Sequence, residues 1–253
     1  MSDHLVVIPV FNESPSIEEI VARARRHGGV LVVDDGSSDG SGRRAAAAGA
    51  DVLRLPRRGG KGAALKRGFS EALKRGAHRV VTLDGDGQHD PDDIPRMLGA
   101  AAEAPDTLII GGRLGAALDG GSGVIPPGRL AALRVAGFFI NWLTGVSVAD
   151  TQSGFRVYPA RLLEAVTPRH GGFVLETEML IRAAADGWRL LEVPITAIHF
   201  TDRRSRFRPV RDGIAVGAYL AGQIVRRWAR ECATAAAALA RPFAAERIGR
   251  AHV

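Results

Sequence analysis

The sharpest chemical signal in the sequence is a pair of aspartates separated by one glycine, Asp84-Gly85-Asp86. In an extended segment, residues i and i+2 point to the same side, so both carboxylates can face one cation. Gly85 lets the backbone turn tightly beside a bulky ligand. Oxygen ligands suit Mg²⁺ or Mn²⁺, and Mg²⁺ is typically bound by one or two carboxylates together with substrate phosphates. The spacing therefore predicts a metal site at Asp84, Asp86 and Gln88, with an ordinary Asp-Gly turn as the alternative.

Two further acidic clusters follow short apolar runs. Pro9-Val-Phe-Asn-Glu13 comes after the first run, and Asp34-Asp-Gly-Ser-Ser-Asp39 comes after the second. Each cluster alone could serve only turns and helix caps. Open α/β sheets, however, place their ligands at the carboxyl ends of parallel strands. With the Asp84 motif as the third cluster, the pattern predicts a ligand site at one edge of a sheet.

A glycine-rich segment, Gly59-Gly-Lys61-Gly62, is another candidate for phosphate binding. It lacks the Ser or Thr that a phosphate-binding loop places directly after its lysine, because Gly62 and Ala63 follow Lys61. We interpret the segment as the start of a helix whose Lys61 can approach a diphosphate. A solvated lysine at a helix cap is the alternative.

The first 110 residues alternate short apolar runs with helical segments. The runs predict strands at residues 5–9, 30–33, 51–55, 79–83 and 107–110, with helices at residues 16–27, 40–48, 62–75 and 91–104. Ser16 and Glu19 have the spacing of a capping box at the first helix. Strands separated by helices of this length form βαβ units, so the sequence predicts an α/β fold with a mainly parallel sheet.

This alternation ends after Gly112. The segment Gly115–Gly128 is rich in glycine and proline, and a loop of this length in a compact domain is usually functional. Further helices are predicted at residues 130–143, 176–185 and 212–230, with a strand at 189–193 and a loop at 147–154. No linker or repeat is evident. The sequence predicts one main domain at residues 1–211, followed by a basic helix and tail at residues 212–253.

The composition suits a globular protein, because 46% of the 253 residues are hydrophobic and 24% are charged. The net charge of +7 is concentrated at one end: residues 201–253 hold 11 Lys and Arg against 4 Asp and Glu. A basic end indicates an anionic partner surface, either a membrane or a nucleic acid. The low aromatic content and the acidic sheet edge argue against nucleic acid. An anionic membrane surface is therefore the expected partner.

No segment predicts a transmembrane helix. The uncharged stretch Gly213–Val225 has 13 residues, whereas about 20 are needed to span a bilayer. The first residues show no signal peptide pattern, and the lone Cys232 excludes a disulfide framework and fits a reducing compartment. These features predict a cytoplasmic protein that is peripheral at the cytoplasmic face of the membrane, where each Arg contributes roughly 1 kcal/mol.

Six sequence blocks in a fixed order carry a family resemblance. They are Pro-Val-Phe-Asn-Glu13, Val-Val-Asp-Asp-Gly-Ser-Ser-Asp-Gly40, Gly-Lys-Gly-Ala-Ala64, Asp84-Gly-Asp-Gly-Gln-His-Asp-Pro, Gly-Gly-Arg113 and Asp150-Thr-Gln-Ser-Gly-Phe-Arg. Together they resemble glycosyltransferase family 2, most closely its polyprenyl- or dolichyl-phosphate mannosyltransferase and glucosyltransferase branch, over about residues 4–212.

The resemblance implies a fold and a reaction. The fold would be GT-A, a Rossmann-like three-layer α/β fold with a mainly parallel central sheet. The reaction would be an inverting, metal-dependent transfer of a hexose, mannose or glucose, from a GDP- or UDP-sugar to a polyprenyl or dolichyl phosphate. This branch often carries C-terminal transmembrane helices, and here the basic tail would take their place at the membrane.

The resemblance also assigns site residues by position. Asp84, Asp86 and Gln88 would hold Mg²⁺ or Mn²⁺, and Arg134 would serve the acceptor. Arg203 and Arg206 match a family stretch that ends in Arg, Ser and Lys, although this stretch is shorter here and Arg206 replaces the Lys. The nucleotide sugar would be bound by Pro9, Phe11, Glu13, Val33, Asp35, Lys61, Asp84, Gly85, Asp86, Arg113, Arg203 and Arg206.

The catalytic residues would be Asp86, Arg113 and Asp150. An inverting displacement needs a carboxylate on the face of the sugar opposite the leaving diphosphate, within hydrogen-bond reach of the acceptor oxygen, and Asp150 is the candidate general base. A helix cap or a salt bridge to Arg156 is the alternative for Asp150, and Glu176 or Glu178 could take the place of the base. Because a lipid phosphate is already ionised, positioning by arginine could matter more than deprotonation.

Two other functions remain open at this point. One keeps the donor chemistry but uses a soluble or glycan hydroxyl as acceptor, for which Asp150 would be indispensable as base. The other is a non-catalytic nucleotide-sugar-binding module, which is disfavoured because no expected acidic or arginine position is missing. The number of subunits and the choice between the two nucleotides, sugars and metals also stay open.

Overall fold

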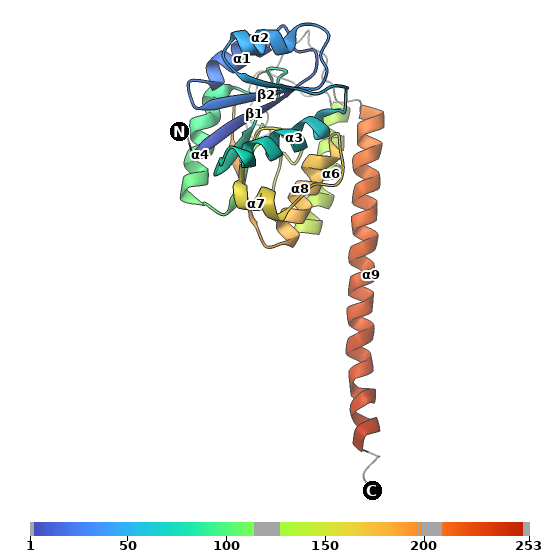
Figure 1. The fold of residues 1–253 in the computed structure, drawn as a ribbon. Coiled ribbons are helices and arrows are strands. Elements are labelled where there is room, and N and C mark those ends of the chain that lie inside the picture. Colours follow the sequence, from blue (N-terminus) through green and yellow to red (C-terminus); the bar gives the residue numbers. More distant parts are fainter. Residues whose placement is uncertain (1–2, 114–126, 197, 199–208, 250–253) are drawn as a thin grey trace. The chain divides into compact units, whose positions relative to one another are not determined.

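The computed structural model describes residues 3–113, 127–196, 198 and 209–249 (Figure 1). The chain divides into two compact units, Met1–Val216 and Gly217–Val253. The boundary between the units falls inside the long helix α9 (Pro209–Gly249). This helix begins before the predicted Asp212 and continues past the predicted Arg230. The domain boundary at residues 211 and 212 stays a prediction.

One mixed sheet of seven strands forms the centre of the first unit, in the order β3-β2-β1-β4-β6-β5-β7. Strand β6 runs antiparallel to β4 and β5, and all other neighbours are parallel. The expected mainly parallel sheet is therefore confirmed. The strands are β1 (His4–Val10), β2 (Gly29–Asp34), β3 (Asp51–Arg54), β4 (Arg79–Thr82), β5 (Thr107–Gly112), β6 (Arg156–Pro159) and β7 (Arg189–Pro194).

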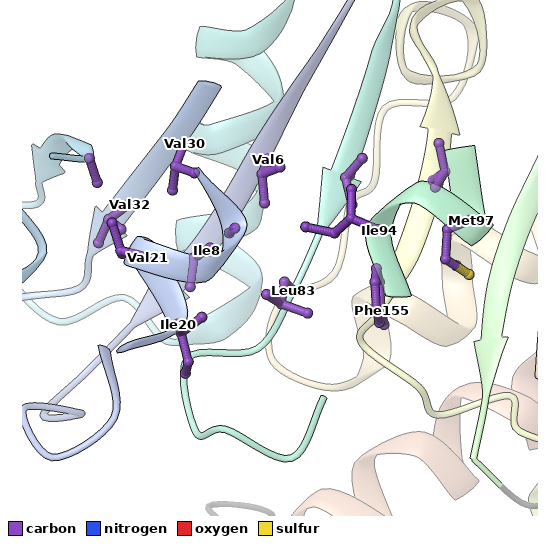
Figure 2. Packing of buried hydrophobic residues seen from close by; sticks show 14 of the residues in the cluster. Val6, Ile8, Ile20, Val21, Val30, Val32, Leu83, Ile94, Met97 and Phe155 are labelled. Atoms are coloured by element: carbon purple, nitrogen blue, oxygen red, sulfur yellow. The ribbon is translucent and has the colours of Figure 1, made fainter. Parts of the chain in front are cut away.

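Helices cover both faces of this sheet, because successive side chains of a buried strand point to opposite sides. Val6 and Ile8 of β1 point to the face covered by α1 (Ile17–Ala24), α2 (Ser41–Ala47) and α4 (Ile94–Glu103) (Figure 2). Val7 points to the other face, beneath α3 (Lys61–Lys74). The other helices that the structure describes before α9 are η1 (Pro91–Asp93), α6 (Pro127–Thr144), α7 (Ala160–Ala165) and α8 (Val174–Ala185). The result is the expected three-layer α/β fold.

The predicted capping box is wrong. Ser16 lies at the N-cap of α1, but its side chain makes no capping hydrogen bond. Its hydroxyl donates instead to the backbone carbonyl of Gly85 at 2.8 Å. Helix α1 also ends at Ala24, short of the predicted His27. Ser16 therefore links α1 to the loop after β4, where the sequence pattern indicated only a local helix start.

Two elements were missing from the sequence-based expectation, β6 and α7. Strand β6 has only four residues, begins with an arginine and ends with a proline, so it shows no strand-like alternation. Arg156 is nevertheless fully buried, because its guanidinium donates to three backbone carbonyls at 2.8 Å, those of Thr151, Ser153 and Glu176. A buried arginine whose three nitrogens each donate to a backbone carbonyl cannot be recognised from a local sequence pattern.

Helix α6 begins at Pro127, so the last two residues of the predicted loop at Gly115–Gly128 are helical instead. The rest of that loop, residues 114–126, lies outside the described residues. The helix itself was predicted at residues 130–143 and ends at Thr144. Within the part of the chain that the structure describes, no helix carries an apolar stretch long enough to cross a membrane.

Candidate active site

Side chains from three elements meet at the motif that follows β4. Lys61, the first residue of α3, donates from Nζ to Asp84 Oδ1 at 2.7 Å and to Glu176 Oε1 at 2.9 Å. Glu176 lies in the first turn of α8 and is buried. Its second oxygen, Oε2, has no hydrogen-bond partner among the described residues. The acidic motif and the glycine-rich segment of Lys61 therefore form one site, together with a glutamate from the second half of the chain.

The loop before β6 closes on the same motif. A Cβ atom at Gly154 would overlap the carboxylate of Asp84, so only glycine lets this backbone approach so closely. The Thr82 hydroxyl donates to the Gly154 carbonyl at 2.8 Å, which fixes the loop to the end of β4. The predicted loop at residues 147–154 is therefore part of the site.

Burial and charge affect the carboxyls of the motif differently. Burial acts to raise the pKa of Asp84, but Lys61, with smaller contributions from His89 and Arg113, holds this pKa below its usual range. Burial and the negative charge of Asp84 raise the pKa of Asp86. A carboxyl with a raised pKa is stabilised in its ionised form by an added positive charge. Asp86 is therefore the carboxyl that gains most from a bound cation.

The donors at this motif fit a metal ion that shares its coordination with a substrate. Across the described ranges, no three His, Cys, Asp or Glu side chains gather closely enough to hold a metal by themselves. Asp84 and Asp86 offer carboxylate oxygens, and the backbone amide of Gln88 donates to Asp86 Oδ1 at 3.0 Å, which orders this turn. Two carboxylates with open positions for phosphate oxygens suit Mg²⁺ or Mn²⁺.

The candidate nucleotide residue Asp35 has a structural partner. Its two oxygens accept the backbone amides of Gly59 at 2.6 Å and Gly60 at 2.7 Å. These glycines directly precede Lys61, so Asp35 fixes the start of α3 and with it the position of Lys61. The side chain of Val33, in contrast, is buried beneath α3, so this residue would reach a nucleotide through its backbone.

The segment after β1 supplies further candidate nucleotide contacts. The guanidinium of Arg58 lies 4.0 Å from the centre of the Phe11 ring, a cation–π arrangement. The backbone amide of Glu13 donates to the Ser41 hydroxyl at 2.7 Å, which ties this segment to α2. Pro9 is the penultimate residue of β1 and is partly buried. These residues lie at the carboxyl end of β1, beside that of β2.

Arg113 directly follows β5 and forms an ion pair with Asp150. Its Nε and Nη2 atoms donate to the two oxygens of Asp150 at 2.7 Å and 3.1 Å, and its backbone amide donates to Oδ2 at 3.2 Å. The Asp150 side chain is 0% exposed and that of Arg113 is 14% exposed. The alternative of a salt bridge from Asp150 to Arg156 is therefore wrong, because the partner is Arg113.

This pairing determines the acid–base character of Asp150. Burial acts to raise the pKa of this carboxyl, but the charge and hydrogen bonds of Arg113 hold it below the usual range. A general base works best when its pKa lies near the working pH. The geometry therefore suits Asp150 for holding the guanidinium of Arg113 better than for removing a proton.

Glu178, the other alternative base, is bound by backbone. Its carboxylate accepts the amides of Arg169 at 3.0 Å and His170 at 2.8 Å, and Arg182 lies 3.5 Å away. Burial acts to raise its pKa, but the two amides lower it. Glu178 thus fixes the segment before α8. Glu176 instead shares the ammonium of Lys61 with Asp84.

The candidate acceptor residue Arg134 is exposed on α6. The same helix holds the loop that carries Asp150: Asn141 accepts the amide of Val148 at 3.1 Å and donates to its carbonyl at 3.0 Å. Arg203 and Arg206 lie outside the described residues.

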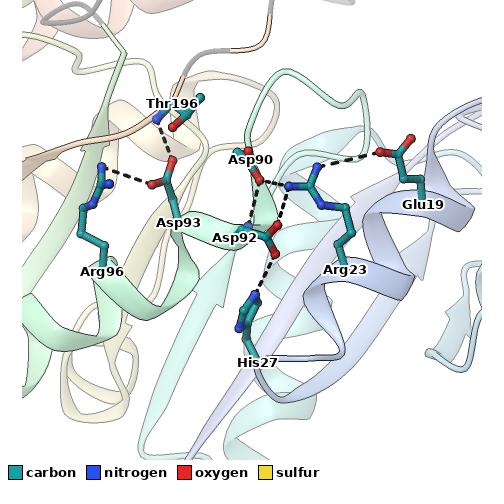
Figure 3. Close-up of polar contacts among 8 residues, drawn as sticks. All are labelled: Glu19, Arg23, His27, Asp90, Asp92, Asp93, Arg96 and Thr196. Atoms are coloured by element: carbon teal, nitrogen blue, oxygen red, sulfur yellow. Dashed lines mark hydrogen bonds and ion pairs between the residues drawn. The ribbon is translucent and has the colours of Figure 1, made fainter.

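A cluster of charged residues anchors the segment that follows the Asp84-Gly85-Asp86 motif. Arg23 of α1 pairs with Asp90 and Asp92, which begin η1 directly after the motif (Figure 3). Asp93 of η1 accepts the backbone amide of Thr196 at 2.6 Å. The segment Asp84–Asp90 is therefore anchored both to α1 and to the chain after β7.

Sequence reasoning missed Glu192. Its carboxylate accepts the backbone amides of Ala149 at 2.5 Å and Asp150 at 3.0 Å. One signal was available, namely a single acidic residue within the apolar strand Arg189–Pro194. A lone acidic residue on a strand reads as a solvated position unless its partner is known, and here the partner lies more than 40 residues earlier in the chain.

The chain matches the model of the family "Glycosyl transferase family 2" over residues 5–166, which is more than half of its length. The chain belongs to glycosyl transferase family 2. Polyprenol monophosphomannose synthase of Mycolicibacterium smegmatis is 35% identical to this glycosyltransferase over 221 residues, covering 79% of this chain and 77% of that protein. Undecaprenyl-phosphate mannosyltransferase of Micrococcus luteus is 34% identical over 213 residues, covering 77% and 83%.

A solved structure with the same fold is glucosyl-3-phosphoglycerate synthase from Mycobacterium tuberculosis, determined with Mn²⁺, uridine diphosphate and phosphoglyceric acid. It superposes on this glycosyltransferase with a TM-score of 0.67 at 22% identity, covering 88% of this chain and 78% of that chain. The likeness shows the GT-A fold. The expectations of a GT-A fold and of a glycosyltransferase are therefore confirmed.

Proposed function

We propose that this family 2 glycosyltransferase transfers a hexose, mannose or glucose, from a nucleotide diphosphate sugar to a polyprenyl or dolichyl phosphate, with inversion and with a divalent metal ion. The observation that carries the proposal is the pairing of Arg113 with Asp150 at the sheet edge that also holds Asp84, Asp86 and Lys61. This edge offers cations to two phosphate-bearing substrates. Of the candidate bases beside them, Asp150 is held ionised by Arg113, and Glu176, whose pKa burial raises, is paired with Lys61. The names of the two relatives, polyprenol monophosphomannose synthase and undecaprenyl-phosphate mannosyltransferase, support mannose as the sugar and a polyprenyl phosphate as the acceptor.

The donor side is assigned to the motif after β4. A Mg²⁺ or Mn²⁺ ion held by Asp84, Asp86 and Gln88 would offset the charge that builds up on the departing diphosphate. The ammonium of Lys61, between Asp84 and Glu176, is placed to meet a phosphate oxygen. Mn²⁺ and uridine diphosphate in glucosyl-3-phosphoglycerate synthase agree with this assignment. The nucleotide itself is assigned to Pro9, Phe11, Glu13, Val33, Asp35 and Gly85.

A phosphate acceptor suits the site better than a hydroxyl. A hydroxyl must lose its proton and needs a base whose pKa lies near the working pH. Asp150 is held ionised by Arg113, and Glu178 is bound by backbone amides, so both carboxyls have a lowered pKa. A phosphate oxygen is already ionised and needs a cation that orients it. We assign that role to Arg113, with Arg134, Arg203 and Arg206 as further candidate arginines.

A lipid acceptor lies in a membrane, so the enzyme needs a surface that binds there. Helix α6 has apolar side chains exposed to solvent. Val135, Phe138 and Trp142 are exposed at helical spacing, and Phe138 is 65% exposed. Arg134 lies beside them on the same helix and is also exposed. Because the same helix anchors the loop of Asp150, apolar groups that enter a lipid interface would bring Arg113 close to a lipid phosphate.

Helix α9 shows the same combination of side chains. It exposes Val225 and Trp228 next to Arg226, Arg227 and Arg230. Apolar and cationic side chains together bind anionic interfaces, where each arginine contributes roughly 1 kcal/mol. We therefore propose a peripheral position at an anionic membrane surface. The protein should sediment with anionic but not with neutral vesicles, and added salt should release it because the Debye length falls from about 10 Å at 0.1 M to about 3 Å at 1 M.

Vesicle binding can be separated from catalysis. Replacing Arg226, Arg227 and Arg230 together by Gln should weaken sedimentation with anionic vesicles, while transfer to a short polyprenyl phosphate in detergent stays near the wild-type rate. A full-length protein that ignores anionic vesicles at low salt would contradict the membrane proposal.

The transfer reaction itself is tested with a panel of donors and matched acceptors. Purified protein is incubated with GDP-mannose, UDP-glucose and related nucleotide sugars, with Mg²⁺ or Mn²⁺, and with a short polyprenyl phosphate or the corresponding free polyprenol. We expect one donor to give a lipid-linked hexose with the phosphate and none with the alcohol. Efficient transfer to the alcohol or to a soluble sugar, with none to the phosphate, would contradict the proposal.

A further inference from the structure

We propose that Glu192 is a positioning residue that fixes the guanidinium of Arg113 through Asp150. Glu192 lies on β7, opposite Ile110 of the neighbouring strand β5. Its two oxygens accept the backbone amides of Ala149 and Asp150 at 2.5 Å and 3.0 Å. Asp150 in turn accepts three hydrogen bonds from Arg113. The role of Arg113 in binding a phosphate rests on the proposed function, whereas this chain of contacts does not.

Gly112 makes the arrangement possible. A Cβ atom at this position would overlap the carboxylate of Glu192. Gly112 also directly precedes Arg113, so the backbone that carries the arginine lies against the same carboxylate that orders Asp150. A side chain at Gly112 would displace Glu192 while leaving its charge and its chemistry intact. This gives a second, independent way to disturb the chain of contacts.

The loop of Asp150 is held at two neighbouring places. Asn141 of α6 binds both backbone groups of Val148, and Glu192 binds the next two amides. Without Glu192, the loop would keep its attachment at Val148, but the carboxyl of Asp150 would be free to shift relative to β5. A displacement of about 1 Å in a substrate-positioning group can lower a rate by about 100-fold. We therefore expect kcat to fall by about 10- to 100-fold when Glu192 is disturbed.

Two variants and one control probe this role. Glu192→Gln places an amide NH₂ group against backbone N–H donors, so one hydrogen bond is lost with little change in shape. Gly112→Ala pushes the intact carboxylate away. Glu164→Gln makes the same chemical change on an exposed glutamate of α7 and serves as the control.

The direct readout is hydrogen exchange of the Arg113 Nε–H group, followed by NMR and assigned through its loss in Arg113→Lys. Exchange should be at least about 10-fold faster in Glu192→Gln and Gly112→Ala than in the wild type and in Glu164→Gln. The Nε–H group of Arg156, which donates to the Ser153 carbonyl at 2.8 Å, is an internal reference. General loosening of the fold would accelerate both arginines, whereas loss of positioning accelerates only Arg113. Unchanged exchange at Arg113, or equal acceleration at both arginines, would overturn the proposal.

Kinetics add a second test. If Glu192 acts through Arg113, then adding Glu192→Gln to Arg113→Ala should lower kcat by less than about 2-fold further, because the group being positioned is already absent. An equal loss in both backgrounds would show that Glu192 acts independently and would overturn the positioning role. If the wild type forms no hexosyl lipid while the exchange results hold, the proposed function fails and the positioning of Arg113 by Glu192 stands.

Discussion

The two partly buried cations of the site are held in opposite ways. Lys61 contacts Asp84 and Glu176 through one nitrogen atom at the end of a flexible side chain. Arg113 binds Asp150 with two side-chain nitrogens and its backbone amide, and Asp150 is itself tied to Glu192. A lysine can change partners with little rearrangement, whereas a bidentate guanidinium is fixed in direction. In the proposed function, the donor side at Lys61 would adjust when ligands bind, and the acceptor side at Arg113 would be set before they arrive.

This difference matches the chemistry expected on each side. A departing diphosphate changes its charge during the reaction, and a mobile ammonium can follow that change. An acceptor phosphate must point one oxygen at the sugar, which requires a cation of fixed orientation. The following substitutions, ordered from the largest expected effect to the smallest, are designed to disturb one side and leave the other intact.

The largest loss is expected for Asp86→Ala. This change removes one oxygen ligand of the proposed metal and leaves the Lys61–Asp84 and Arg113–Asp150 pairs in place. Loss of metal stabilisation of the leaving group is worth several kcal/mol, so transfer should fall by at least about 1000-fold. Transfer is measured with excess Mn²⁺, with Asp106→Ala at an exposed position as the control. Wild-type protein that keeps full activity in excess chelator would show that no metal is needed.

Arg113→Lys should lower kcat by about 100-fold. Lysine keeps the positive charge but cannot make the two parallel hydrogen bonds to Asp150, so the charge no longer points in one direction. Steady-state transfer kinetics measure the effect, and Arg161→Lys, on an exposed arginine of α7, is the matched control. A variant as active as the wild type would mean that charge alone suffices on the acceptor side.

Lys61→Met should destabilise the protein by about 3 kcal/mol, because it leaves the buried Glu176 and the partly buried Asp84 without their cation. Adding Mn²⁺ with a nucleoside diphosphate should restore more of this loss in the variant than it adds to the wild type, since a bound cation can take over the charge of Asp84. Thermal unfolding with and without these ligands measures both effects. Lys74→Met, at the exposed end of the same helix, should show neither.

Asp150→Asn should have a pH-dependent effect on stability of about 2 kcal/mol. The pKa of Asp150 in the folded protein lies below its unfolded value of about 3.9, so ionised Asp150 stabilises the fold above that pH, and this contribution is lost as the pH falls through the folded pKa. Urea unfolding should show the full difference from the wild type at pH 7 and a smaller one below pH ~4. A difference that stays constant over this pH range would mean that Arg113 does not hold this carboxyl ionised.

The donor side could be anticipated from the sequence because its signals are local. Asp84 and Asp86 are two residues apart, and the strand before them is a continuous apolar run. The alternation of strands and helices over the first 110 residues then places the three acidic clusters at one edge. What stayed hidden is the partner of Lys61: Glu176 approaches it across more than 100 residues of chain, and no local pattern encodes that contact.

The acceptor side was harder to anticipate because long-range contacts define it. Asp150 was expected to act as a general base, to cap a helix or to pair with Arg156, six residues away, yet it pairs with Arg113. Arg156 instead donates to backbone carbonyls of the loop before β6 and of α8. Because β6 begins with this arginine and ends with a proline, it shows no strand-like pattern. No role was expected for Glu192 from the sequence, because its partners at Ala149 and Asp150 lie more than 40 residues earlier in the chain. Pairings between charged residues depend on topology, which local periodicity does not reveal.

The central claim is that the hexose moves to a phosphate oxygen with inversion at the anomeric carbon. The most direct measurement is NMR of the product formed from a nucleotide hexose labelled with ¹³C at the anomeric carbon and a short polyprenyl phosphate. The account predicts an anomeric carbon coupled to one phosphorus atom, with a configuration opposite to that of the donor. A product with retained configuration, or an anomeric carbon without phosphorus coupling, would contradict it.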